Sequence, residues 1–332
     1  MSGNPKKALI TGISGQDGSY LAEYLLQQGY EVIGVSRRPR SPNLVEIESH
    51  SQLKLVPCDI ADQAWIHGLL NHVQPDEIYN LAALSHVGSS FEHPGATFAS
   101  IVQGVLHILD WCRTSPATRL YQASSSEMFG GSLTQPPHKA PYQDEQTPFA
   151  PNSPYAAAKL AAHNLVRVYR TSYNLFACCG ILFNHESPRR GFDFVTRKIT
   201  NHIGRWRANP DLLRANPLQL GNLHACRDWG YAPDYVRAMH LMLTADEPDD
   251  YVVATGETHT VGEFLVEAFQ AADLEFEMDF IRQNDVYRRP CEVHYLRGNS
   301  EKIRNRLGWR PTTSFRGLVQ IMVDADLRTY AS

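Results

Sequence analysis

The stretch Lys7-Ala8-Leu9-Ile10-Thr11-Gly12-Ile13-Ser14-Gly15-Gln16-Asp17-Gly18 decides the fold of this chain. It opens with an apolar run that predicts a buried strand, and a turn with a glycine at every third position follows at once. Residues 19–28 then carry leucines at helical spacing, Gly29 closes that helix, and residues 31–35 predict a second strand. A strand, a glycine turn, a helix and a strand within about thirty residues form the βαβ unit that binds a dinucleotide.

The glycine turn predicts a phosphate site. Glycines let the backbone approach a pyrophosphate at a helix N-terminus, where free N–H groups and the helix dipole favour anions. The alternative is a tight strand–helix turn without a ligand, which the complete βαβ unit makes less favourable. The predicted cofactor contacts of this turn are Gly12, Gly15, Gln16, Asp17 and Gly18.

The end of the second strand indicates which dinucleotide is bound. An NAD site has an acidic residue about twenty residues after the glycine turn, and this chain has Ser36-Arg37-Arg38 instead. Guanidinium groups suit a 2′-phosphate, so we predict NADP, with Arg37 and Arg38 as contacts. After the next strand, Asp59 and Ile60 are expected at the adenine edge, although Asp59 serves equally well as a helix N-cap. Leu81 is a further predicted cofactor contact.

Tyr155 and Lys159 lie in Ser153-Pro154-Tyr155-Ala156-Ala157-Ala158-Lys159 and form a candidate catalytic pair. Residues four apart share one face of a helix, so we expect the two side chains to be neighbours and both to meet the cofactor. The Lys159 ammonium would stabilise a tyrosinate and lower the pKa of Tyr155 towards neutrality, which makes Tyr155 a proton acceptor. This spacing is common by chance, but behind a glycine turn of this kind it is a strong indication of catalysis.

Serines and a glutamate, Ser124 to Glu127, follow the strand expected at residues 119–123. The carboxyl edge of a parallel sheet is where such folds do chemistry, and Ser125 can there bind the oxygen that Tyr155 deprotonates. Glu127 adds a carboxylate, which a plain dehydrogenase does not need and a dehydratase needs to remove a carbon-bound proton. The alternatives are a hydrogen-bonded turn for the serines and a capping or ion-pairing role for Glu127.

Apolar runs alternate with helical patterns along the first half of the chain. Further strands are expected at residues 53–56, 77–81, 119–123 and 176–183, and helices at residues 97–113 and 155–173. This alternation predicts an α/β fold: a doubly wound parallel sheet of the Rossmann type with a smaller, mixed substrate-binding domain. We expect residues 1–183 with 219–256 to bind the dinucleotide, and residues 184–218 with 257–332 to bind the second substrate.

The composition limits the classes of partner. The 332 residues are 43% hydrophobic, with a formal net charge of -4 and no basic tract, which argues against nucleic acid or an anionic membrane. No apolar stretch is long enough to span a bilayer and no signal peptide is legible, so we expect a cytoplasmic protein. Six cysteines without metal-type spacing are expected to be reduced thiols, and we predict no metal site.

Several motifs, in a fixed order, resemble one family. They are residues 10–23, 78–83, 85–87, 121–127, 153–160 and 180–191, then Arg227-Asp228-Trp229-Gly230, residues 251–259 and Arg289-Pro290-Cys291-Glu292-Val293. Together they resemble the GDP-mannose 4,6-dehydratase family of extended short-chain dehydrogenases/reductases, and the resemblance runs nearly from end to end.

The resemblance implies a role for individual residues. Ser125 stands where the family has the threonine of its catalytic set, Glu127 matches the elimination base, and Tyr155 with Lys159 matches the oxidation base and its lysine. The predicted GDP-sugar contacts are Ser85, Asn184, Lys198, Arg227, Arg289 and Glu292. A diphosphate favours cations and a ribose diol favours a carboxylate, although a structural salt bridge is the alternative for each arginine. His185-Glu186 has no second histidine at helical spacing, so we reject a zinc site there.

The activity that the resemblance implies is NADP-dependent dehydration of GDP-mannose to GDP-4-keto-6-deoxy-mannose. Tyr155 takes the C4 hydroxyl proton, hydride leaves C4, Glu127 removes the C5 proton with loss of water from C6, and hydride returns to C6. Ser126 stands where glucose-type dehydratases carry an aspartate, so one carboxylate serves both proton removal and loss of water. The alternatives are another GDP-hexose or GDP-heptose as substrate, a reductase of the 4-keto product, and a non-catalytic NADP-binding protein.

The resemblance also implies an oligomer. We expect a homodimer in which the helices at residues 97–113 and 155–173 pack against a second copy. In the family, the segment that corresponds to the residues after Arg38 helps to join dimers into tetramers. In this chain that segment is shorter than is usual. A homotetramer is therefore the alternative assembly.

Overall fold

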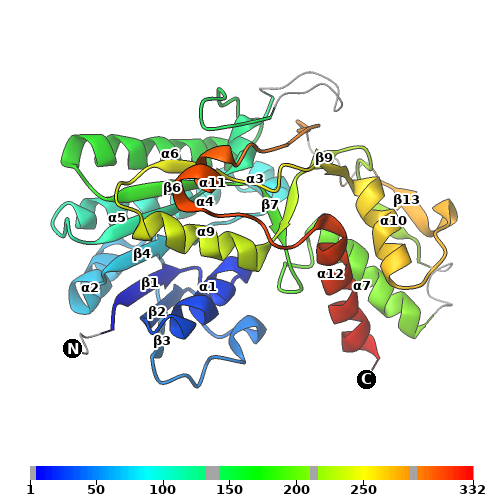
Figure 1. Cartoon of the computed structure of the whole chain (residues 1–332), viewed down its shortest axis with the longest axis horizontal. Helices are drawn as coiled ribbons and strands as arrows, with labels where there is room; N and C mark the ends of the chain where they lie inside the picture. Colours follow the sequence, from blue (N-terminus) through cyan, green and yellow to red (C-terminus); the bar gives the residue numbers. More distant parts are fainter. Residues whose placement is uncertain (1–4, 132–141, 210–215, 285–286, 288–289, 332) are drawn as a thin grey trace.

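A computed structural model describes residues 5–131, 142–209, 216–284, 287 and 290–331. Helices flank a central parallel sheet, and a smaller, mostly helical region that includes α7, α10 and α12 lies beside it (Figure 1). None of the helices that the structure describes has the length and apolar character needed to cross a membrane.

Seven parallel strands form the central sheet, in the order β11-β6-β5-β4-β1-β2-β3. Their bounds are β1 (Lys7–Thr11), β2 (Glu31–Ser36), β3 (Leu53–Pro57), β4 (Glu77–Asn80), β5 (Arg119–Ser125), β6 (Ala177–Leu182) and β11 (Asp250–Val253). The chain runs outward from β1 to β3 and then crosses to β4 on the other side of β1. The switch point of the topology therefore lies between β1 and β4, where such sheets bind their ligands. The predicted doubly wound parallel sheet is confirmed.

Of the helices around the sheet, those predicted at residues 19–28, 97–113 and 155–173 are present, and the first two differ in detail. The helices around the sheet are α1 (Gln16–Gln27), α2 (Gln63–Val73), α3 (Val87–Glu92), α4 (Pro94–Phe98), α5 (Gly104–Cys112), α6 (Pro154–Tyr173), α9 (Ala232–Thr244) and α11 (Glu301–Leu307), with 3-10 turns at Pro42–Leu44 and Ser126–Phe129. The first helix begins at Gln16, three residues before the predicted start at residue 19. The helix expected over residues 97–113 contains a π-helical turn at Ala99–Gln103.

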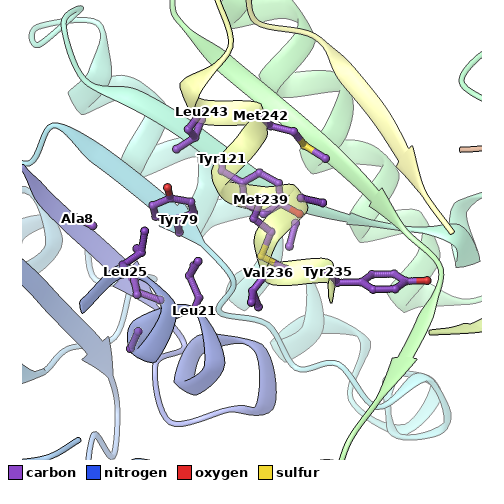
Figure 2. Packing of buried hydrophobic residues seen from close by; sticks show 14 of the residues in the cluster. Ala8, Leu21, Leu25, Tyr79, Tyr121, Tyr235, Val236, Met239, Met242 and Leu243 are labelled. Atoms are coloured by element: carbon purple, nitrogen blue, oxygen red, sulfur yellow. The ribbon is translucent and has the colours of Figure 1, made fainter. Parts of the chain in front are cut away.

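Successive side chains of each strand point to opposite faces of the sheet and enter different cores. On β4, Ile78 packs with α2, α5 and α6, whereas Tyr79 packs with α1 and α9. Figure 2 shows the second of these cores, in which leucines of α1 and methionines of α9 converge on Tyr79 and Tyr121. Helices thus cover both faces of the sheet, and the candidate site lies at the carboxyl ends of the strands.

The smaller region has its own core and short strand pairs. Its elements are β7 (Asn184–Glu186) with β10 (Trp229–Tyr231), β8 (Leu218–Leu220) with β13 (Ile281–Gln283), β9 (Cys226–Arg227) with β12 (His259–Thr260), α7 (Val195–Ala208), α10 (Val261–Ala271), a 3-10 turn at Met278–Phe280 and α12 (Phe315–Tyr330). Trp206, Trp229, Phe264 and Val319 are buried together there. The limits of the two domains given above stay a prediction.

Candidate active site

A cavity of about 1260 Å³ lies at the carboxyl ends of the central strands. Its lining includes Gly12 after β1, Ser36 at the end of β2, Leu81 after β4, Ser125 at the end of β5 and Phe183 after β6. Residues of β7, α7 and β8 complete the wall from the smaller region. The cavity therefore spans both parts of the molecule, as a site for two ligands requires.

Most of the predicted site residues line this one cavity. They are Gly12, Gly15, Gln16, Asp17, Gly18, Arg37, Asp59, Ile60, Leu81, Ser85, Ser125, Glu127, Tyr155, Lys159, Asn184, Lys198, Arg227 and Glu292. Arg38 is exposed and is not part of the lining. Arg289 lies outside the described residues.

The glycine turn has the shape that a pyrophosphate needs. Gly12 has a φ of +74°, which an L side chain rarely adopts, and a Cβ on Gly18 would lie 2.4 Å from the carbonyl oxygen of Gly12. Gly15 is the N-cap of α1 and supplies no capping side chain, and it lines the cavity together with the first turn of this helix. These features fit the pyrophosphate of a dinucleotide.

Asp17 in the first turn of α1 is held by His185 of β7. Nε2 of His185 lies 2.8 Å from Oδ2 of Asp17, and Nδ1 of His185 bonds the Phe183 carbonyl over 2.7 Å. Burial acts to raise the pKa of Asp17, but the charge and hydrogen bond of His185 outweigh it and lower that pKa to about 2. Burial acts to lower the pKa of His185, and Asp17 reverses this, so that pKa is raised. The carboxylate charge beside the glycine turn is thereby compensated.

The ribose end of the cavity contains Arg37 but not Arg38. Ser36 and Ser14 join the turn to the end of β2 through a hydroxyl–hydroxyl distance of 2.9 Å. The N-cap of α2 is Asp62, whose carboxylate accepts the Trp65 N–H. Asp59 is therefore not that cap, and it lines the cavity beside Ile60.

The catalytic candidates Ser125, Glu127 and Tyr155 meet in the buried part of the cavity. Tyr155 and Glu127 are 8% and 7% exposed, so both are shielded from bulk water. Burial raises the pKa of Tyr155 to about 12, while a hydrogen bond with Ser125 acts to lower it and the charge of Glu127 to raise it. Ser125 also caps the 3-10 turn that carries Glu127 by accepting its N–H over 3.2 Å. One serine thus contacts both the tyrosine and the segment of the carboxylate.

Lys159 lies beside Tyr155, but its ammonium donates to a backbone carbonyl. Its Nζ donates to the Ala123 carbonyl over 2.7 Å and lies 5.8 Å from the centroid of the Tyr155 ring. Burial lowers the pKa of Lys159 to about 8. The burial of the phenol acts on the pKa of Tyr155 in the direction opposite to the predicted effect of Lys159, and the near-neutral value stays a prediction.

Two further polar side chains of the cavity were not predicted. Arg190 forms an ion pair with Glu186 over 3.1 Å, and its guanidinium lies 3.6 Å from the centroid of the Phe194 ring. Its charge acts to lower the pKa of Tyr155, so it belongs to the electrostatics of the reacting centre. The motif at residues 180–191 contains both residues, but nothing in its spacing indicates that Arg190 acts on Tyr155.

The predicted substrate contacts Arg227 and Glu292 are partners of each other. Nη2 of Arg227 lies 3.3 Å from Oε1 of Glu292, and Nη1 donates to the carbonyls of Cys226 and Val293. On the same wall, Nζ of Lys198 lies 4.0 Å from the centroid of the Tyr287 ring. Burial lowers the pKa of Lys198. The wall thus offers cations and one carboxylate to a ligand.

Within the described part of the chain, one group of side chains has the donors and spacing of a metal site. His163, Cys179 and Asp250 place their donor atoms within 4.8 Å of one another. Both carboxylate oxygens of Asp250 accept bonds from Arg170, and none of the three residues lines the cavity. Because the Asp250 carboxylate is already bound by Arg170, we interpret this group as an internal polar cluster outside the cavity.

The parallel sheet, the glycine turn and the Tyr155–Lys159 pair at the same sheet edge place the protein among the short-chain dehydrogenases/reductases. The family model described as GDP-mannose 4,6 dehydratase matches residues 9–322. The chain therefore belongs to the GDP-mannose 4,6-dehydratase family.

Similar proteins cover nearly the whole chain. GDP-mannose 4,6 dehydratase 1 of Arabidopsis thaliana is 48% identical over 338 residues, which are 97% of this chain and 90% of the relative. GDP-mannose 4,6 dehydratase of Homo sapiens is 44% identical, with 98% of this chain and 92% of the relative covered.

Solved structures share the fold. The UDP-glucose 4-epimerase of Thermus thermophilus, in complex with NAD, has a TM-score of 0.83 at 25% identity and covers 96% of this chain and 98% of its own. The dTDP-glucose 4,6-dehydratase DesIV of Streptomyces venezuelae has a TM-score of 0.85 at 24% identity, with 98% of both chains covered. The second likeness is evidence of the fold alone.

Proposed function

We propose that this protein dehydrates GDP-mannose to GDP-4-keto-6-deoxy-mannose. The observation that carries the proposal is the convergence of Tyr155, Ser125 and Glu127 with the glycine turn in one cavity, in a chain of this family. Relatives at 48% and 44% identity that carry this name support the same substrate.

A nicotinamide dinucleotide is the cofactor, and we propose NADP. The glycine turn and the N-terminus of α1 would hold its pyrophosphate, and Arg37 would face a 2′-phosphate. When bound, the nicotinamide supplies the hydride chemistry, accepting hydride from C4 of the sugar and returning it to C6. The net reaction loses one water and neither consumes nor produces reduced cofactor.

The side chains of the chain handle the protons. Ser125 donates a hydrogen bond to the C4 oxygen, and Tyr155 takes the proton of that hydroxyl while Lys159 and Arg190 stabilise the developing charges. The C4 ketone acidifies the C5–H bond, and Glu127 removes this proton. Water then leaves C6 with a proton returned by Glu127, so that the single carboxylate acts first as a base and then as an acid. As hydride returns to C6, C5 takes up a proton, which balances the one that Tyr155 took from the C4 hydroxyl.

The wall of the smaller region binds the nucleotide. Arg227 and Lys198 would neutralise the diphosphate, and Glu292 would accept the ribose hydroxyls. Binding of the ribose competes with the Arg227–Glu292 ion pair, so Glu292 exchanges one hydrogen-bonded partner for another. Asn184 and Ser85 lie on the same cavity near the expected sugar.

The experiment that tests this function is incubation of the purified protein with GDP-mannose, followed by mass spectrometry of the nucleotide sugar. We expect the loss of one water from GDP-mannose without added NADPH. An unchanged mass, with the cofactor demonstrably bound, would contradict the proposal. Parallel incubations with other GDP-hexoses and a GDP-heptose distinguish a different substrate from a protein without this chemistry.

A further inference from the structure

A row of buried polar side chains crosses three neighbouring strands immediately before the residues that line the cavity. Thr11 of β1 pairs in register with Asn80 of β4, and Asn80 pairs with Gln122 of β5. Their exposed fractions are 0%, 2% and 2%. Buried hydroxyl and amide groups cost free energy unless they are hydrogen-bonded, so the hydrogen-bond partners of this row decide whether it is stable.

Hydrogen bonds connect the row to the catalytic lysine. Oγ1 of Thr11 donates to Asn80 over 2.7 Å, Nδ2 of Asn80 donates to Gln122 over 2.7 Å, and Nε2 of Gln122 donates to the Ala123 carbonyl over 2.9 Å. The Nζ of Lys159 donates to the same carbonyl over 2.7 Å. The amide of Gln122 therefore shares its acceptor with the ammonium, and both groups are held by the same backbone carbonyl.

The row also contacts the cofactor side of the cavity. The hydroxyl oxygen of Thr11 accepts the N–H groups of Leu81 and Ala82, each over 3.1 Å. A Cβ on Gly12 would lie 3.0 Å from the nitrogen of Ala82, so this segment is packed directly against the glycine turn. The same hydroxyl thus belongs both to the turn that meets the cofactor and to the row that ends at Lys159.

We propose that Gln122 is a positioning residue for Lys159. Backed by Asn80 and Thr11, its amide fixes the Ala123 carbonyl and so holds the ammonium in its place beside Tyr155. The inference rests on the proposed function, because the alignment of Lys159 matters for the oxidation that Tyr155 begins. Gln122 itself touches neither the cavity nor any ligand, since it is absent from the lining.

The ionisable groups that face Lys159 are not part of the row. Asp17 of α1 and Cys179 of β6 act on its pKa, and the ring of Tyr155 lies beside it on α6. A substitution of Gln122 leaves these three groups in place. A change in the titration of Lys159 then results from the loss of the Gln122 amide at the Ala123 carbonyl.

The first test measures turnover of GDP-mannose by the full-length Gln122→Met variant, which keeps the side-chain length and removes the amide. We expect kcat to fall about 10- to 100-fold, as for other buried partners of functional groups, while KM and the Kd of NADP change less than about twofold. The matched control is Tyr79→Phe, which removes a buried hydroxyl next to Asn80 on the opposite face of the sheet. A kcat that matches the control would overturn the inference.

The second test needs no turnover, so it separates failure of the inference from failure of the proposed function. Lysines are labelled with ¹³C at Cε, and Lys159 is assigned by the signal that is missing in Lys159→Arg. We expect the titration midpoint of Lys159 to shift in Gln122→Met, because the amide that shares the Ala123 carbonyl with the ammonium is removed. An unchanged midpoint would contradict the assignment even if GDP-mannose is not the substrate.

A third pair of variants covers the case in which Gln122→Met does not fold. Thr11→Val removes the hydroxyl at the start of the row, and Thr11→Ser keeps it. We expect a shifted midpoint of Lys159 with valine and recovery of the original midpoint with serine. Equal midpoints in the two variants would overturn the inference.

Discussion

Asp17 and His185 are 168 positions apart in the sequence and form an ion pair in which Oδ2 and Nε2 are separated by 2.8 Å. The pair joins the first turn of α1 to β7. Gln16 strengthens the junction, since its Nε2 donates to the carboxylate of Asp17 and to the carbonyl of His185. The turn proposed for the cofactor is therefore tied to the strand that starts with the predicted substrate contact Asn184.

We expect His185→Gln to reduce the free energy of unfolding by about 2 kcal/mol at pH 5.5, judged from a shift of the Asp17 pKa from 3.8 to about 2. The contribution of Asp17 is present above pH 3.8 and is lost as the pH falls towards 2. The pKa of His185 is raised from 6.5. The stability that His185 contributes is therefore fully present below pH 6.5 and is lost as the pH rises through the raised pKa.

Urea unfolding at several pH values measures this difference, with the exposed His72 as the control position (His72→Gln). The loss caused by His185→Gln should be largest between pH 3.8 and 6.5 and should shrink on both sides. A loss that is the same at every pH would show that the ion pair is not its source.

Gly18→Ala should abolish cofactor binding. The added Cβ would lie 2.4 Å from the Gly12 carbonyl oxygen and 2.6 Å from the Cα of Ile13, both backbone atoms that cannot move without opening the turn. Gly68 in α2 has open space around its Cβ position, so Gly68→Ala should bind NADP normally and gain up to about 1 kcal/mol of stability. Fluorescence titration with NADPH tests both variants; tight binding by Gly18→Ala would remove the turn from the cofactor site.

Tyr155→Phe should lower the rate of C4 oxidation by about 10²- to 10⁴-fold, because a positioned proton acceptor is lost. Burial already raises the pKa of the tyrosine to about 12, so the phenylalanine introduces no new burial cost and the fold should persist. Single-turnover mass spectrometry of GDP-mannose measures the rate. A rate equal to that of the unmodified protein would exclude tyrosinate chemistry.

Glu127→Gln should keep NADP binding and block the loss of water. The amide preserves the shape of the side chain but cannot accept the C5 proton, so the sugar should stop at or before the 4-keto stage. Deuterium exchange at C5 and the mass of the sugar are the measurements. Normal formation of the dehydrated product would exclude Glu127 as the base.

Arg37→Ala should weaken NADP binding more than NAD binding, because only NADP carries the 2′-phosphate. Arg38→Ala serves as the neighbouring control, since Arg37 lines the cavity and Arg38 does not. We expect a loss of about tenfold or more in NADP affinity for the first variant and a smaller one for the second. Equal losses for both cofactors in Arg37→Ala would argue against the phosphate contact.

Much of the fold is legible in the sequence because the central strands are short, largely apolar segments that alternate with helical patterns. The start of α1 is not, since Gln16, Asp17 and Gly18 carry no apolar side chain and the helical spacing begins only at Leu21. The π-helical turn at Ala99–Gln103 likewise leaves no mark on the hydrophobic spacing. Local geometry of this kind depends on tertiary packing rather than on the periodicity of the chain.

The sequence predicts which residues belong to the candidate site, but it does not predict the contacts between them. Motifs in the right order bring Ser125, Glu127 and Tyr155 to one cavity, as the sequence predicts. The raised pKa of Tyr155 was not predicted, because spacing along a helix indicates the nearness of Lys159 but not the burial around the phenol. Arg227 and Glu292 lie in two separate motifs, and the motifs do not indicate that the chain between them brings these two side chains together.

The cavity that begins at Gly12 and ends at Glu292 has a consequence for the protein as it is synthesised. The glycine turn, Ser125 and Tyr155 leave the ribosome while the residues of the nucleotide-binding wall have still to be translated. The edge strand β11, which pairs with β6, is also completed only at Val253. A nascent chain thus contains the residues predicted to bind a dinucleotide before those predicted to bind the sugar nucleotide. A premature stop between the two sets would leave an incomplete cavity and an unpaired edge on strand β6.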